Sequence, residues 1–228
     1  FPNIEPNKIW ENIYASHVNR KTGISDETII KEVISANNSW AKSSGHAFEE
    51  IIKEIGNKHF SSHRIKILLQ KDLNLELNNE NVLNEPRDII WLKQKVSGNI
   101  FDLYLTIEEE SKFKVFGCVQ AKTSIRERVK GDREPSMDAM NHNFFSIAIA
   151  LDGEFLRMPK FINMVNGNSD EYVSNGWHYM YVITNEIIDN DRIRSIDTEM
   201  QKFINDCIKG AHSWETQRQW LDHEWKAV

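Results

Sequence analysis

The stretch GNIFDLYLTIEEESKFKVFGCVQAK, residues 98–122, carries most of what the sequence says about the fold. It contains two runs in which residue character alternates, 100–107 and 113–121, separated by the polar segment 108–112. Alternation with a period of two is typical of strands, and a short polar segment between two such runs is typical of a hairpin. We therefore expect two neighbouring antiparallel strands here.

The faces of this expected hairpin differ in chemistry. Asp102 shares a face with Tyr104 on the first strand, while Cys118, Gln120 and Lys122 share a face of the second strand. The hairpin places Asp102 near Cys118 and one pleat from Gln120. A carboxylate there can bind Mg²⁺, and the lysine can orient or deprotonate a water molecule. The opposite face of the second strand is expected to point to the core and consists of Phe113, Val115, Gly117, Val119 and Ala121.

The rest of the chain mixes helical and strand patterns. Further strands are expected at 65–70, 88–93 and 178–184. Helices with one apolar face are expected at 26–36, 43–55, 136–151, 192–209 and 213–226. Gly56 and Asn57 are interpreted as a helix end, and Pro135 as the first turn of a helix. This order predicts a mixed α/β domain with one central sheet covered by helices.

Three segments resemble the PD-(D/E)XK nuclease superfamily. Asp102 followed by Gln120-Ala121-Lys122 is similar to its motif, with Gln in the (D/E) position. SSGHAFEEII, residues 43–52, resembles its first core helix, and KTSIRERV, residues 122–129, resembles the stretch after the catalytic lysine of many type II restriction endonucleases. The resemblance covers roughly residues 43–184. It implies an α/β, restriction-endonuclease-like mixed central sheet flanked by helices.

The resemblance also implies a catalytic set of Asp102, Gln120, Lys122 and Glu49. Asp102 matches the metal-binding aspartate, Lys122 the catalytic lysine and Glu49 the supporting acid of the first helix. Helix geometry favours Glu49 over Glu50, because Glu49 borders the apolar stripe of the helix. Asp102, Gln120 and Glu49 are the expected Mg²⁺ ligands. An amide oxygen is a neutral and weaker Mg²⁺ ligand than a carboxylate, so a catalytically silent DNA-binding module is one alternative.

A basic segment after the lysine contains the candidate DNA-binding residues. Arginine can pair with guanine and glutamate can accept from cytosine, so Arg126, Glu127 and Arg128 have the chemistry of a G·C reader. The spacing of Arg126 is similar to that in restriction enzymes that cut around CCGG, although the Glu127-Arg128 pair comes one residue early. Lys130 and Arg133 are expected to contact phosphates.

Composition limits the remaining classes. The chain has 228 residues and a net charge of −6, from 28 Lys+Arg against 34 Asp+Glu, which argues against a charge-driven, non-specific nucleic-acid coat. Two cysteines suit a reducing, cytoplasmic setting in a bacterium or archaeon. The sequence contains neither an apolar run of about 20 residues nor a nucleotide-binding glycine motif, so we expect no membrane span and no nucleotide cofactor. We expect one nuclease domain over 1–228, with a catalytic core at 43–184 and helical additions at 1–42 and 185–228.

The resulting hypothesis is a type II restriction endonuclease. It would use Mg²⁺ to hydrolyse phosphodiester bonds of double-stranded DNA at a short site and leave 5′-phosphates, as the resemblance implies. A palindromic site implies a homodimer, and the tryptophan-rich C-terminal segment is a candidate interface. Besides the silent module, the other alternative is a repair or recombination nuclease of the same fold that reads DNA structure.

Overall fold

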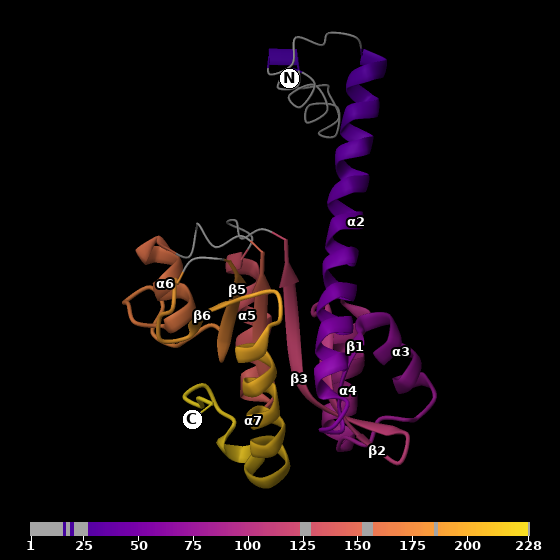
Figure 1. Cartoon of the computed structure of the whole chain (residues 1–228), viewed down its shortest axis with the longest axis vertical. Coiled ribbons are helices and arrows are strands. Elements are labelled where there is room, and N and C mark those ends of the chain that lie inside the picture. The colour runs from indigo at the N-terminus through magenta and orange to yellow at the C-terminus, as the bar shows by residue number, and fades with distance from the viewer. Residues whose placement is uncertain are drawn as a thin grey trace, which may run out of the picture. The chain divides into compact units, whose positions relative to one another are not determined.

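The computed structural model describes residues 16, 19–20, 27–123, 129–151, 157–184 and 187–227. The chain divides into two compact units, Phe1–His46 and Ala47–Val228. Helix α2 (Glu27–Phe60) begins in the first unit and ends in the second. The sheet and all elements from β1 onward belong to the second unit (Figure 1).

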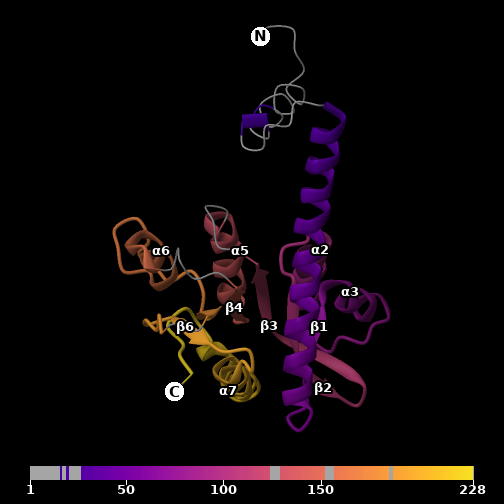
Figure 2. The same cartoon turned by 45° about the horizontal axis from the view of Figure 1, so that its top comes forward.

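The second unit is built on a six-stranded mixed sheet. Strands β1 to β3 are antiparallel and β3 to β6 are parallel. Figure 2 shows β3 with β4 on one side and β1 and β2 on the other. The expected hairpin and the strands expected near 65–70 and 178–184 are confirmed. In sheet order the strands are β1 (Ile65–Leu69), β2 (Leu103–Glu109), β3 (Lys112–Lys122), β4 (Phe145–Ala150), β5 (Tyr179–Ile183) and β6 (Ile193–Ile196).

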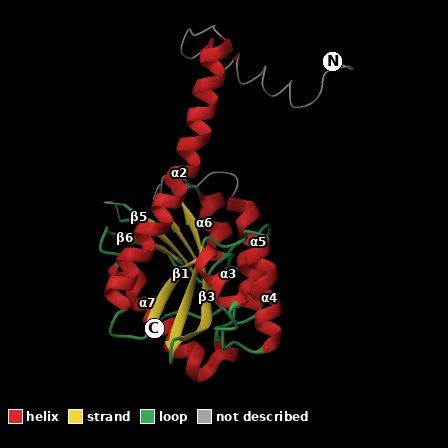
Figure 3. Cartoon of the chain, turned by 90° about the vertical axis from the view of Figure 1, so that its right-hand side faces the viewer, coloured by secondary structure: helices red, strands yellow, loops and turns green. Residues whose placement is uncertain are grey.

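Helices cover both faces of this sheet (Figure 3). Residues 47–60 of α2 pack on one face together with α7, which is followed by the short helix η2. The other helices pack on the opposite face. None of the helices among the described residues is apolar over a length that could cross a membrane. The helices of the second unit after α2 are α3 (Gln70–Asn78), α4 (Pro86–Ser97), α5 (Val129–Asn141), α6 (Pro159–Asn166), α7 (Gln201–Gln217) and η2 (Arg218–Trp220).

A β-bulge in β3 overturns one expectation about the hairpin. Leu105 pairs with Gly117 but Thr106 pairs with Val115, so Phe116 is an extra residue in β3. The bulge moves Val115 to the face covered by α3, α4 and α5, and Phe116 to the face covered by α2 and α7. The single core-directed face expected for this strand is therefore wrong: β3 is buried on both sides.

The strand expected at 88–93 is wrong, because this segment lies within α4. The buried residues Trp91, Leu92 and Val96 recur at helical spacing, and Pro86 occupies the first turn. Proline is favoured at that position because the missing N–H has no partner within the helix. Pro86 was thus the sequence signal that could have identified a helix here.

The helix expected at 136–151 is wrong as well. Helix α5 begins before Pro135 and ends at Asn141, and the following apolar run forms β4, whose six residues are all buried. A strand buried on both faces reads as a continuous apolar run, which periodicity alone does not distinguish from a buried helix. Pro135 consequently lies inside α5 rather than in a first turn.

The C-terminal elements also begin and end elsewhere than expected. The segment expected as a helix at 192–209 starts with β6, which pairs in parallel with β5 and completes the sheet. Helix α7 follows and ends at Gln217, so the separate helix expected at 213–226 is wrong. The C-terminal addition therefore contributes a strand as well as helices.

The two helices expected at 26–36 and 43–55 are one helix, α2, which continues through Gly56 and Asn57. A Cβ at position 56 would lie 2.3 Å from Cδ1 of Ile67, so the glycine permits α2 to approach β1 closely. The Asn57 side chain accepts a hydrogen bond from the Ile67 N–H (2.7 Å) and donates to its carbonyl (3.1 Å). These bonds satisfy the outward backbone groups of an edge strand.

Candidate active site

Asp102 lies directly before β2, beside the carboxyl end of the antiparallel strand β3. Its backbone N–H donates to the carbonyl of Val119 (3.1 Å), and its carbonyl accepts from Gln70 (3.1 Å). Its Oδ2 accepts a hydrogen bond from the N–H of Ala121 at 2.7 Å. Main-chain contacts thus fix both the position and the orientation of this carboxylate.

Lys122 ends β3 and brings two carboxylates together. Its Nζ lies 3.8 Å from Oδ2 of Asp102 and 3.3 Å from Oδ1 of Asp132, which α5 contributes. The three side chains are 26–29% exposed, so solvent reaches the group. We call Asp102, Lys122 and Asp132 the active-site cluster. The sequence does not single out Asp132, because its approach to Lys122 depends on how α5 packs.

Gln120 is buried, and both ends of its side-chain amide are bonded within the protein. Its Oε1 accepts from Nε1 of Trp177 (2.7 Å), and its Nε2 donates to the main-chain carbonyl of Asp132 (2.9 Å). The sequence placed Gln120 correctly, one pleat before Lys122 on the same face of β3. Its expected role as a metal ligand stays a prediction.

Glu49 lies in the part of α2 that belongs to the second unit. It is half-buried and follows Phe48, a residue of the core, as its place beside the apolar stripe predicted. The neighbouring Glu50 instead pairs with Lys53 (3.4 Å) and Lys71 (3.2 Å). Partial burial alone would raise the pKa of Glu50. Its two lysine partners together have the larger, opposite effect, so the pKa lies below its usual value. The role of Glu49 as a supporting acid stays a prediction.

The expected DNA-binding residues divide into three groups. Arg126, Glu127 and Arg128 lie outside the described residues. Lys130 is exposed near the start of α5. Arg133 is partly buried, and burial lowers its pKa. The structure does not test these DNA-binding roles.

The contacts of Arg133 lie within the protein. Its Nε donates to the carbonyl of Met164 (3.2 Å), its Nη2 donates to the carbonyl of Ser174, and its guanidinium lies 5.1 Å from the centre of the Tyr172 ring. These contacts tie α5 to the segment that includes the end of α6. Arg133 therefore has a structural role beside the phosphate contact predicted for it.

Cys118 lies on the same face of β3 as Gln120 but is completely buried in the core. Burial raises the pKa of its thiol well above the usual value, so the nucleophilic thiolate is disfavoured. Among the described residues, no three His, Cys, Asp or Glu side chains form a group that could hold a metal ion.

The arrangement of these elements defines a class of protein. A mixed sheet with an aspartate at the start of β2 and a lysine at the end of the adjacent β3 is the arrangement of the restriction-endonuclease fold. The family described as "BsaWI restriction endonuclease type 2" matches residues 78–220, and the chain belongs to this family. It is a type II site-specific deoxyribonuclease, as the sequence predicted.

Two solved structures are similar to the chain. Restriction endonuclease BsaWI, crystallised in a pre-specific complex with DNA, has 54% sequence identity over 100% of this chain and 83% of its own, with a TM-score of 0.88. Restriction endonuclease AgeI, crystallised in a specific complex with DNA, has 19% identity over 86% of this chain and 73% of its own, with a TM-score of 0.51. The likeness to AgeI concerns the fold alone. None of the curated protein sequences compared with the chain is significantly similar to it.

Proposed function

We propose that this chain hydrolyses phosphodiester bonds of double-stranded DNA at a short, defined sequence, uses Mg²⁺ and leaves 5′-phosphate ends. The observation that carries the proposal is the convergence of Asp102 and Asp132 on Lys122 in a chain of the BsaWI family. The presence of DNA in the BsaWI and AgeI crystals supports DNA as the substrate. Family membership favours this function over a repair nuclease or a silent binding module.

The residues at the site fit a hard divalent cation. Mg²⁺ sites in phosphoryl-transfer enzymes typically use one or two carboxylates and complete the shell with water and substrate phosphate oxygens. Asp102 and Asp132 supply two carboxylates, and Glu49 is the proposed supporting acid. The amide oxygen of Gln120 already accepts from Trp177 at 2.7 Å, which leaves its second lone pair for a cation. The bound ion would polarise the scissile phosphate and neutralise charge that develops on it.

The protein groups have separate tasks in this proposal. The N–H of Ala121 orients the carboxylate of Asp102. The Lys122 ammonium, placed between two carboxylates, would position the attacking water and stabilise negative charge on the phosphate in the transition state. Because Lys122 ends a strand of the central sheet, its backbone is rigidly held.

For recognition we propose base contacts by Arg126, Glu127 and Arg128 and phosphate contacts by Lys130 and Arg133, with a CCGG-type core in the site. Two copies related by a twofold axis would place one active site on each strand of a palindrome. The tryptophan-rich C-terminal segment, residues 213–226, is the proposed interface.

The experiment that tests the function uses a fully sequenced phage DNA, incubated with the protein in Mg²⁺ or in EDTA. We expect discrete fragments in Mg²⁺ alone, with 5′-phosphates that permit direct ligation. A smear would contradict sequence specificity. Intact DNA that still shifts on a gel would contradict catalysis and identify a binding module.

A further inference from the structure

A continuous chain of hydrogen bonds joins the segment before β5 to the active-site cluster through the interior of the protein. We infer that Trp177 and Gln120 are positioning residues, which hold the start of α5 so that the carboxylate of Asp132 meets Lys122. The inference rests on the proposed function, because it assigns how that site is assembled. It gives Gln120 a task other than metal binding.

The first link fixes the orientation of the Gln120 amide. The indole N–H of Trp177 can only donate, and it lies 2.7 Å from Oε1 of Gln120. The carbonyl of Asp132 can only accept, and it lies 2.9 Å from Nε2. A donor on one side and an acceptor on the other leave one orientation of the amide, with its NH₂ group towards α5.

The second link matters because the start of α5 is weak by itself. Gly131 is among the poorest helix formers, and Pro135 has no N–H to bond the carbonyl four residues earlier, which is that of Gly131. Asp132 lies between these two residues. Its place therefore depends on bonds from outside the helix, and the bond from Gln120 is one that acts directly on its main chain.

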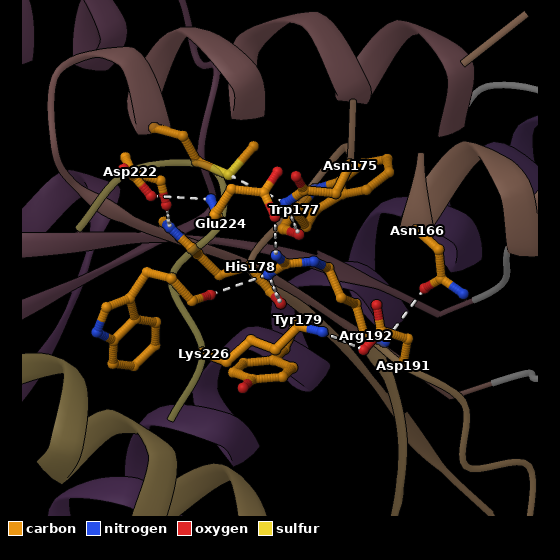
Figure 4. Close-up of polar contacts among 12 residues, drawn as sticks. Asn166, Asn175, Trp177, His178, Tyr179, Asp191, Arg192, Asp222, Glu224 and Lys226 are labelled. Atoms are coloured by element: carbon orange, nitrogen blue, oxygen red, sulfur yellow. Dashed lines mark hydrogen bonds and ion pairs between the residues drawn. The ribbon is translucent and has the colours of Figure 1, made fainter. Parts of the chain in front are cut away.

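Burial holds Trp177, the first donor in the series of hydrogen bonds, in place. Trp177 is completely buried, and the carbonyl of Trp177 accepts from Nδ2 of Asn175 at 2.8 Å (Figure 4). The small side chains of Ala148 and Ala150 on β4 line the same cavity as Gln120 and Trp177. The cavity between these residues and the active-site cluster measures about 10 Å³, about the smallest volume that holds one water molecule.

Metal binding that turned the amide of Gln120 would work against this arrangement. Turning the amide oxygen towards a cation would leave the buried indole N–H of Trp177 without its acceptor. It would also withdraw the NH₂ group from the carbonyl of Asp132. Buried donors and acceptors that lose their partners are strongly disfavoured.

The first test is Trp177→Phe, which keeps an aromatic ring and removes the N–H. We expect the single-turnover cleavage rate to fall about 10–100-fold, because small displacements of catalytic groups have effects of that size. DNA binding measured with Ca²⁺ in place of Mg²⁺ should be unchanged. Hydrogen exchange measured without metal should rise in the peptide covering 129–137. An unchanged rate together with unchanged exchange would overturn the inference.

Trp91→Phe is the matched control. It also removes a buried indole N–H that donates to α5, here to Oδ2 of Asp138 at 2.9 Å. Asp138 keeps Lys95 as a partner at 2.7 Å, and it lies well beyond the first turn. We expect the wild-type cleavage rate. An equal loss in both variants would show a general loosening of α5 and would overturn the specific role of Trp177.

Gln120→Glu decides between positioning and metal binding, even if Trp177→Phe fails to fold. The carboxylate still accepts from Trp177 but has no N–H to donate to Asp132. Positioning predicts a lower rate that added Mg²⁺ does not restore. A lower Mg²⁺ requirement with a rate at or above that of the wild type would identify a ligand and overturn the inference. Absence of cleavage by the wild-type protein would instead contradict the proposed function.

Discussion

Two polar clusters lie against the central sheet of this protein, and they differ in how far their charged side chains are exposed to solvent. The active-site cluster holds Asp102, Lys122 and Asp132 with side chains 26–29% exposed. The second, which we call the C-terminal cluster, contains His178 and Arg192 together with the main-chain carbonyls of residues 222 and 225, and its two side chains are 0% and 2% exposed. Opposite charges meet near solvent in the first cluster, whereas the side chains of His178 and Arg192 are buried. Glu224, which lies 4.0 Å from Arg192, is the exposed partner of the second cluster. Both clusters are polar, so polarity does not distinguish them. The solvent exposure of the side chains separates a cluster that substrate can reach from one that stabilises the fold.

The C-terminal cluster fixes the last residues of the chain to β4 and β5 (Figure 4). The N–H of Ser146 donates to Nδ1 of His178 at 3.0 Å, so Nε2 carries the proton and donates to the carbonyl of Asp222 at 2.7 Å. Nη1 of Arg192 donates to the carbonyls of His178 (3.3 Å) and Trp225 (3.0 Å). Burial lowers the pKa of His178 to about 3, so its ring is neutral.

The largest effect is expected from Lys122→Ala, which breaks the active-site cluster. Loss of a group that positions the attacking water should lower the cleavage rate by about 10²–10⁴-fold. The side chain is partly exposed, so the free energy of unfolding should change little. Single-turnover cleavage, gel shift with Ca²⁺ and thermal unfolding test this. Persistent cleavage would mean that the site is assigned wrongly.

The next effect concerns pH and the C-terminal cluster. Because folding lowers the pKa of His178, its stabilising contribution is present above the unfolded value of 6.5 and is lost as the pH falls towards about 3. Between these values the wild type should lose about 1.4 kcal/mol per pH unit relative to His178→Gln, which has no titrating ring. Urea unfolding of both proteins from pH 7 to pH 4 measures the difference. Parallel stability curves would contradict the neutral, buried ring.

Arg192→Met breaks the C-terminal cluster and keeps the aliphatic part of the side chain. It removes the charged donor to two buried carbonyls, and we expect a loss of about 2–4 kcal/mol in the free energy of unfolding. Cleavage well below the melting temperature should remain close to that of the wild type, in contrast to Lys122→Ala. A large fall in the cleavage rate of the folded variant would show that the two clusters are coupled.

The smallest effects are expected on DNA binding, from substitutions in the basic segment that follows the exposed active-site cluster. If Arg126 reads a base, Arg126→Ala should cost about 1–3 kcal/mol and relax specificity at one position of the site. Lys130→Ala, as the matched loss of a phosphate contact, should weaken binding to all sequences alike and reduce the salt dependence. Competition binding with substituted sites separates the two. A uniform loss for Arg126→Ala would make it a phosphate contact.

The sequence predicted the parts of the fold in which pattern and local geometry agree. The β2–β3 hairpin followed from alternation. Its register did not: the sequence placed Asp102 near Cys118, whereas Tyr104 pairs with Cys118 and Asp102 lies nearer the end of β3, beside Lys122. Alternation did not reveal the bulge at Phe116. Apolar runs also failed to separate the strand β4 from a helix, because burial on both faces removes the periodic signal.

The sequence by itself determined the family resemblance, the hairpin and the gathering of Asp102, Gln120 and Lys122 at one end of the sheet, because these depend on residues close in the chain or joined by one short turn. Only the tertiary structure decided that Asp132 joins them, that Trp177 holds Gln120, and that His178 is sealed while Lys122 meets solvent. Each of these features depends on residues from separate elements. The distances and exposures follow from how helices pack on both faces of the sheet, which no local sequence pattern predicts.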